Sequence, residues 1–258
     1  MKQSRRNFLK FVGISALGLG LAKVAGVEAA GGGGHGPVME PPHDALHAKR
    51  WGMVIDTRKL NTAEAIAPLA EACHSVHNVP TIAAPREMKW LWAESFDGSF
   101  TEMENDRLND EIEHRKFALL CNHCQNPPCV RVCPTKATFK RADGITMMDM
   151  HRCIGCRYCM AACPYGARSF NFGDPQKFVA KPNPEYPMRM RGVVEKCTFC
   201  SERLEAGKQP ACVEASQGAM LFGDLEDKNS PVRKALRENF TIRRKPSLGT
   251  QPSVYYII

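Results

Sequence analysis

The chain has 258 residues, 43% of them hydrophobic, which is enough for one or two compact domains. Its formal net charge is +8, and about half of this excess lies in the first thirty residues. The remaining basic bias is mild and no basic run is interleaved with aromatic residues, so nucleic acid is not expected as a partner.

The first thirty residues are predicted to be an export signal of the twin-arginine type rather than part of the fold. The run Ser4–Lys10, SRRNFLK, resembles the twin-arginine consensus, an apolar stretch follows from Phe11 to Ala22, and Val27–Ala29 resembles a cleavage site. An ordinary secretory signal and an N-terminal membrane anchor are the alternatives. Because twin-arginine signals address a translocase for folded proteins, cofactors can be inserted before export. We therefore expect a periplasmic or other extracytoplasmic location.

Residues 31–50 are predicted to be a flexible linker, since Gly31–Gly34 offers no side chains for packing. No later stretch reaches the roughly 18 apolar residues of a membrane-spanning helix. Association with a membrane is therefore expected to be peripheral, through the leader or through partner proteins.

The rest of the chain predicts short secondary-structure elements joined by long loops. In chain order these are a strand at Trp51–Asp56, a helix at Thr62–Ala72 that breaks or bends near Pro68, a strand at Lys89–Trp92, a hairpin of Ala137–Lys140 with Ile145–Met148, and a closing strand at Ser253–Ile258. Residues 102–116 are highly charged and are expected to form a solvated helix or a loop.

The most informative residues are the twelve cysteines, which fall into runs with regular spacing. Two runs are complete and end in Cys-Pro: Cys121-x2-Cys124-x4-Cys129-x3-Cys133 and Cys153-x2-Cys156-x2-Cys159-x3-Cys163. A third run, Cys197-x2-Cys200 with Cys212, is truncated, and Ser216 lies near the place of its fourth cysteine. Cys73 stands alone.

The second complete run has the spacing of bacterial ferredoxins, in which three cysteines bind one [4Fe-4S] cluster and the fourth binds the neighbouring cluster. Applied to both complete runs, this exchange of fourth ligands predicts two sets of four. Cluster 1 would be held by Cys121, Cys124, Cys129 and Cys163, and cluster 2 by Cys153, Cys156, Cys159 and Cys133.

Residues 51–73 have the residue spacing of a further cysteine run in which the first three ligands are replaced by other residues. Asp56 corresponds to Asp149, which precedes Cys153 by four residues. If this segment pairs with residues 197–216, one cluster would require four residues that do not bind iron: Leu60, Ala63, Ile66 and Ser216. The other, cluster 3, would require Cys73, Cys197, Cys200 and Cys212. The sequence therefore predicts three [4Fe-4S] clusters on a scaffold for four.

Other uses of the cysteines remain open at this point. Zinc is one alternative, because Cys-x2-Cys pairs also hold structural zinc, and the chain would then be a structural or interaction module. Disulfides are another in an exported protein, although closely spaced cysteines are poor partners for one another. Cys73 alone could be a spare buried thiol. No catalytic residue is predicted, because the chain shows no nucleophile with a base and no phosphate-binding loop.

The sequence also predicts whether several other residues, most of them near the cysteines, are buried or exposed. His123 is expected to be a surface residue or a hydrogen-bond donor to cluster sulfur rather than a ligand. Trp90 and Trp92 are expected to pack in the core, and Met188–Arg191 to form a solvated loop. Cations beside the cysteines would raise the cluster potentials if buried, but they are expected to be solvated: Arg131, Lys136, Arg152, Arg157 and Lys196.

From Trp51 onward the chain resembles the electron-transfer subunits of the DMSO reductase beta and polysulfide reductase beta group. The matching segments are Trp51–Asp56, Cys121–Cys129, Cys153–Arg168 and Leu248–Pro252. The resemblance implies an α+β fold of two interleaved bacterial-ferredoxin-like lobes with short hairpins, helices and long loops. Residues 51–84 with 188–258 would form the lobe with one cluster, and residues 85–187 the lobe with two.

With its leader and its missing cluster, the chain is most similar within this group to the DsrO type, found in DsrMKJOP complexes of dissimilatory sulfur metabolism. That similarity implies two partners: an integral NrfD-like quinone-interacting subunit, and a multihaem cytochrome c or other redox subunit. The chain would relay electrons between them. Related exported subunits that serve a nitrite reductase, a hydrogenase or a molybdenum oxidoreductase are the alternative.

Overall fold

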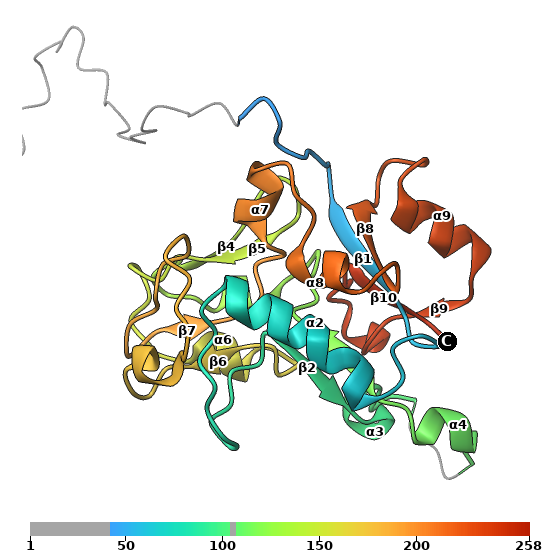
Figure 1. Cartoon of the computed structure of the whole chain (residues 1–258), viewed down its shortest axis with the longest axis horizontal. Coiled ribbons are helices and arrows are strands. Elements are labelled where there is room, and N and C mark those ends of the chain that lie inside the picture. Colours follow the sequence, from blue (N-terminus) through green and yellow to red (C-terminus); the bar gives the residue numbers. More distant parts are fainter. Residues whose placement is uncertain (1–41, 104–106) are drawn as a thin grey trace, which may run out of the picture. The chain divides into compact units, whose positions relative to one another are not determined.

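A four-stranded sheet joins segments from both ends of the described chain (Figure 1). The computed structural model describes residues 42–103 and 107–258, so the predicted leader and the first part of the predicted linker lie outside the described residues. The strand order is β8 (Met220–Asp224), β1 (Trp51–Asp56), β10 (Val254–Ile257) and β9 (Thr241–Ile242). Strand β1 runs parallel to β10 and antiparallel to β8.

Strand β1 is buried on both faces, which explains its nearly continuous apolar sequence. Met53 and Ile55 face the main core, whereas Val54 packs beside Val232 of helix α9 (Pro231–Glu238). The strands predicted at Trp51–Asp56 and Ser253–Ile258 are confirmed, apart from one residue at each end of the second.

Helix α2 (Ala63–Val76) lies along the cysteine-containing part of the fold and contacts β2 (Leu91–Glu94) and α8 (Ala211–Ala215). Thr62 caps its first turn, because the Thr62 hydroxyl accepts a hydrogen bond from the Ala65 N–H at 3.2 Å. The helix is continuous through Pro68, so the break considered there is wrong, whereas the bend stays a prediction. Pro68 is exposed, so water can satisfy the carbonyl that its missing N–H leaves free, while buried residues on either side hold the helix in place.

Three antiparallel strand pairs support the loops that carry the cysteines (Figure 1). They are β2 with β3 (Phe117–Leu120), β4 (Thr138–Lys140) with β5 (Thr146–Met148), and β6 (Ser169–Phe170) with β7 (Val194–Glu195). The β4–β5 pair confirms the predicted hairpin, and β2 begins two residues later than predicted.

The remaining helices are short, as expected for segments that turn around cofactors. They are α3 (Phe96–Ser99), α4 (Asp110–Glu113), α5 (Pro128–Arg131), α6 (Tyr158–Ala161), η1 (Pro175–Phe178), α7 (Ser201–Glu205) and η2 (Pro246–Leu248). Helix α4 is a single turn within the charged 102–116 stretch, of which residues 104–106 are not described.

This mixture of short helices and strand pairs agrees with the predicted α+β class. The division into two interleaved lobes stays a prediction. Across residues 42–103 and 107–258, none of the helices combines the length and the apolar character that crossing a bilayer requires.

Candidate iron–sulfur centres

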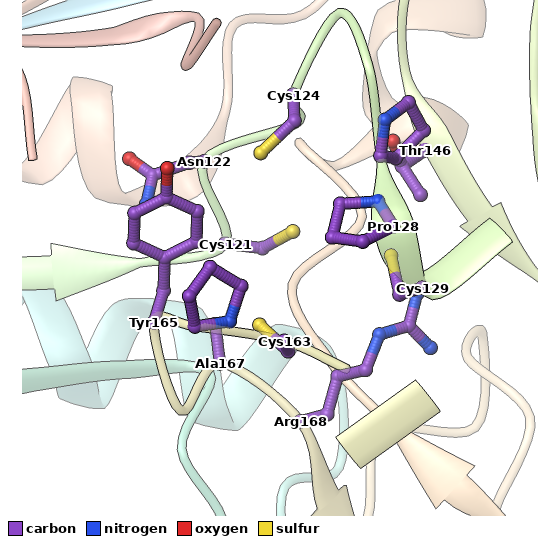
Figure 2. A pocket seen from close by; sticks show the side chains of 12 residues that line it. Cys121, Asn122, Cys124, Pro128, Cys129, Thr146, Cys163, Tyr165, Ala167 and Arg168 are labelled. Atoms are coloured by element: carbon purple, nitrogen blue, oxygen red, sulfur yellow. The ribbon is translucent and has the colours of Figure 1, made fainter. Parts of the chain in front are cut away.

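Four cysteine side chains point toward one another in a cavity just beyond the end of β3 (Figure 2). They are Cys121, Cys124, Cys129 and Cys163, the predicted cluster 1 set, and the space they line measures about 320 Å³, open solvent included. Cys121 directly follows β3, Cys129 lies in the first turn of α5, and Cys163 comes just after α6. Segments some forty residues apart therefore supply one set of thiols, as the exchange of fourth ligands requires.

The walls of this cavity are largely apolar. Tyr165 and Ala167 are buried against Cys124, and the Tyr165 hydroxyl is hydrogen-bonded to Thr250. Burial, followed by the neighbouring Cys121 thiolate, raises the pKa of Cys124 to about 12. Four thiolates in such a place require a compensating cation, which iron would supply.

The predicted cluster 2 set lines a second cavity: Cys133, Cys153, Cys156 and Cys159. This cavity opens to the surface, because Cys156 and the neighbouring Ile154, Arg157 and Tyr158 are all exposed. The tight loop between the ligands uses left-handed backbone at Gly155 (φ +71°) and Arg157 (φ 63°). A side chain at Gly155 would overlap the Gly192 carbonyl oxygen, so glycine is needed there for packing as well as for conformation.

The four cysteines of the predicted cluster 3 set come from three segments of the chain, and all four are buried. Cys73 lies near the end of α2, Cys197 and Cys200 lie between β7 and α7, and Cys212 lies on α8. Burial, followed by the thiolates of Cys197, Cys212 and Cys200, raises the pKa of Cys73 well above its ordinary value. Cys73 is therefore not an isolated thiol: it lies close enough to the three cysteines of the truncated run for their charges to act on it, and it shares a buried core with Cys197 and Cys212.

The four residues predicted to mark a lost cluster site have other roles. Leu60 and Ile66 belong to the same apolar core as Cys73, and Ala63 is exposed at the start of α2. The Ser216 hydroxyl donates to the Val213 carbonyl and accepts from the Met220 N–H, at 2.7 and 2.9 Å. Core packing and a local turn thus occupy the positions that ligands hold in the complete runs.

Sequence reasoning missed two polar neighbours of the third cysteine set, His77 and Glu202. The His77 ring is buried, with Nδ1 2.7 Å from the Cys73 carbonyl oxygen and 3.9 Å from its sulfur, and Nε2 2.8 Å from Glu202 Oε1. Ligand atoms of His77, Glu202 and Cys200 lie within 4.8 Å of one another. The spacing Cys73-x3-His77 at the end of a predicted helix was the available signal, since residues four apart share a helix face.

Two cations near the cysteines are buried. Lys196 is 1% exposed, which corrects the expectation that it is solvated, and Arg168 is 5% exposed. The other cations predicted to be solvated are exposed: Arg131, Lys136, Arg152 and Arg157. His123 is also buried, stacked on Phe199 with ring centroids 3.7 Å apart, and its Nδ1 accepts from the Thr146 N–H.

The expectation of a solvated loop at Met188–Arg191 is wrong for Arg189. Its guanidinium is fully buried, forms an ion pair with Glu195 at 2.9 Å, and donates to the carbonyls of His77 and Asn78. Trp90, buried as predicted, donates its indole N–H to the same carboxylate at 2.7 Å. This network anchors the segment between β6 and β7 to the end of α2.

The residues present fit iron–sulfur clusters. All twelve cysteines are free and they gather in three groups of four, two of them lining cavities and the third enclosed in the core. A [4Fe-4S] cluster is held by four cysteine thiolates, and when bound it supplies one-electron transfer.

Comparison with known proteins agrees with this chemistry. The family described as "4Fe-4S dicluster domain" matches residues 112–181, which contain both complete cysteine runs. The chain is 41% identical to Hdr-like menaquinol oxidoreductase iron-sulfur subunit 1 of Archaeoglobus fulgidus, over 98% of this chain and 97% of the relative. It is 34% identical to NrfC of Escherichia coli K12 (100% and 96%) and 33% identical to a tetrathionate reductase subunit of Salmonella typhimurium (100% and 89%).

The chain belongs to the NrfC/PsrB-like family of [4Fe-4S] iron–sulfur subunits. This confirms the predicted resemblance to the DMSO reductase beta and polysulfide reductase beta group. It is therefore an electron-transfer protein that carries [4Fe-4S] clusters. A zinc module is not supported by these relatives.

Proposed function

We propose that the chain is the exported iron–sulfur subunit of a membrane complex and relays electrons through three [4Fe-4S] clusters. The relay would connect an integral NrfD-like quinone-interacting subunit with a multihaem cytochrome c or another redox subunit. The name of the Archaeoglobus relative, a menaquinol oxidoreductase subunit, supports a quinone at one end. The chain itself would bind no substrate.

The third cysteine set is the observation that carries the number of clusters. Its four thiols are buried together, and Cys73 completes it from a segment more than a hundred residues away. The sets are also neighbours: Cys129 and Cys159 share one apolar cluster with Val194, and Cys121 packs against the core that contains Cys197. These contacts support the order 2–1–3, in which cluster 2 would lie at the surface and cluster 3 in the core.

The assignment to a DsrO-type subunit of sulfur metabolism rests on two sequence features, the twin-arginine-like leader and the loss of one cluster site. An extracytoplasmic location, peripheral on the membrane, follows from the same leader. The alternative is an iron–sulfur subunit that serves a nitrite reductase, a hydrogenase or a molybdenum enzyme. The name of the Salmonella relative, a tetrathionate reductase subunit, supports service to a reductase in general.

Metal analysis of anaerobically purified protein tests the class and the number of clusters. We expect about twelve iron and twelve sulfide per chain, four of each per cluster, and EPR signals from three clusters after reduction with dithionite. About eight iron would contradict the third site. Zinc without iron would contradict the electron relay altogether.

Purification from native membranes tests the partners. We expect the chain to co-purify with an integral membrane protein and a haem protein, and its clusters to be reduced when a menaquinol analogue is added. Clusters that quinol does not reduce in the intact membrane complex would contradict the proposed place in the chain of carriers.

A further inference from the structure

Arg168 and Lys196 are buried cations beside the cysteine sets that lack an acidic partner among the described residues. Arg168 is 5% exposed and Lys196 is 1% exposed, and among the described residues neither forms an ion pair with a carboxylate. A buried charge is strongly unfavourable unless an opposite charge compensates it. Each of these cations therefore needs an anion nearby, and the available anions are the cysteine thiolates and the clusters that they hold.

Arg168 lies between the first and second cysteine sets. Its side chain lines the cluster 1 cavity, and its guanidinium lies beside Cys129 (Figure 2). Its Nη1 donates to the Thr138 hydroxyl at 3.1 Å and lies 3.7 Å from the Met148 sulfur, and both of these residues line the cluster 2 cavity. Nη2 is buried and has no hydrogen-bond partner among the described residues, which leaves it free to donate to cluster sulfur.

Lys196 occupies the corresponding place between the first and third sets. Its ammonium donates to the carbonyl oxygen of Thr146, which lines the cluster 1 cavity, and at 2.8 Å to the carbonyl oxygen of Cys197, a member of the third set. These two bonds hold the positive charge at the boundary between the sites. The cation is fixed by the backbone and is shielded from solvent.

We propose that the buried charges of Arg168 and Lys196 raise the reduction potentials of the clusters beside them. Arg168 would act on clusters 1 and 2, and Lys196 on clusters 1 and 3. The inference rests on the cluster placement proposed above. A cluster held by four thiolates is an anion and becomes more negative when it gains an electron, so a fixed cation favours the reduced form. Because these charges are buried, salt and water screen them weakly. Cluster 1 adjoins both cations and is stabilised most in its reduced form.

Charge-removing and charge-keeping variants of the full-length holoprotein test this arrangement. Midpoint potentials of each cluster would be measured by EPR at a series of fixed solution potentials. For Arg168→Gln we expect the ratio of reduced to oxidised cluster to fall at least tenfold for clusters 1 and 2, about 59 mV for a one-electron couple, with cluster 3 little changed. For Lys196→Met we expect the same fall for clusters 1 and 3, with cluster 2 little changed.

Arg168→Lys, Lys196→Arg and Arg131→Gln are the controls. The first two keep the charge and are expected to keep all three potentials near those of the unmodified protein. The third removes an exposed cation from α5, between Cys129 and Cys133, and is expected to shift no potential appreciably because solvent screens it.

Iron content separates the possible failures. Fewer than three clusters in the unmodified protein contradicts the proposed function, whereas the pairing of Arg168 with clusters 1 and 2 can still be measured. If three clusters are present, equal shifts in all of them, or shifts no larger than those of Arg131→Gln, overturn the inference. If a charge-removing variant loses clusters, the inference stands only if the charge-keeping variant of the same residue retains them. Loss in both variants shows that the residue acts through packing alone and also overturns the inference.

Discussion

At the scale of single residues, Cys73 shows how a site can be completed from a distant segment. It stands alone in the sequence, yet its thiol lies with those of Cys197, Cys200 and Cys212. Its neighbours Leu60 and Ile66 fill the core where ligands would otherwise stand. Cys197 and Cys200 form a local motif, but only packing around α2 brings Cys73 to them.

Replacing Cys73 tests this set directly. Cys73→Ala is expected to abolish or strongly perturb the EPR signal of one cluster and to leave the other two unchanged, because only cluster 3 loses a ligand. Ser75→Ala, on the exposed side of the same helix, is the control and is expected to keep all three signals. Unchanged signals in Cys73→Ala would show that the assigned exchange of ligands is incorrect.

Two glycines with left-handed backbone provide a second test at this scale. Gly155 and Gly166 have φ values of +71° and +65°, but an added Cβ meets backbone only at Gly155, where the Gly192 carbonyl blocks it. Gly166→Ala is expected to cost about 1–2 kcal/mol of stability from backbone strain and to keep every cluster. Gly155→Ala is expected to cost more and to lose cluster 2 selectively, as measured by iron content and EPR. Equal effects of the two changes would contradict the steric argument.

At the scale of elements, α2 connects the sheet to the third cysteine set and contains a proline that does not end it. The helix contacts both β2 and α8, which carries Cys212, and buries Ile66, Leu69 and Cys73 along one side. Tertiary packing thus outweighs the local preference of Pro68, as is common when a helix has a well-buried face.

Replacing Pro68 measures that cost. Pro68→Ala is expected to stabilise the holoprotein by about 1–3 kcal/mol, since alanine restores the missing hydrogen bond and removes the clash of the ring. Pro231→Ala is the matched control: Pro231 stands in the first turn of α9, where no helical hydrogen bond is lost, so no gain is expected. The measurement is the denaturant midpoint under anaerobic conditions. A lower midpoint for Pro68→Ala would show that the proline is needed by the helix.

At the scale of the whole molecule, the three cysteine sets differ in their access to solvent. Cys156 of the second set is exposed, whereas all four cysteines of the third set are buried. The surface around Cys156 also carries Ile154 at 67% and Tyr158 at 61% exposure. Large exposed apolar side chains beside the second cysteine set favour contact with another protein at this end of the proposed order 2–1–3.

This gradient of burial predicts the order in which clusters are lost. When the oxidised protein is incubated with a chelator such as EDTA, cluster 2 is expected to release iron first and cluster 3 last, because water and chelator reach Cys156 without local unfolding. EPR of samples reduced at successive times would follow each cluster. Simultaneous loss of all three would indicate global unfolding instead and contradict the prediction.

The sequence by itself determined the chemistry. Several ligands of a metal–thiolate site lie on one short loop, so their Cys-x2-Cys spacing can be recognised from neighbouring residues alone. The strand at Trp51–Asp56 and the β4–β5 hairpin were equally accessible, since hydrophobic pattern and turn residues act over a few positions. Only the tertiary structure decided which charges are buried. Lys196 and Arg189 read as solvated cations, and nothing in their neighbours along the chain shows that Thr146 or Glu195 will enclose them. The hydrogen bond between His77 and Glu202 likewise depends on packing between segments far apart in the sequence, although the spacing Cys73-x3-His77 was a local signal for His77.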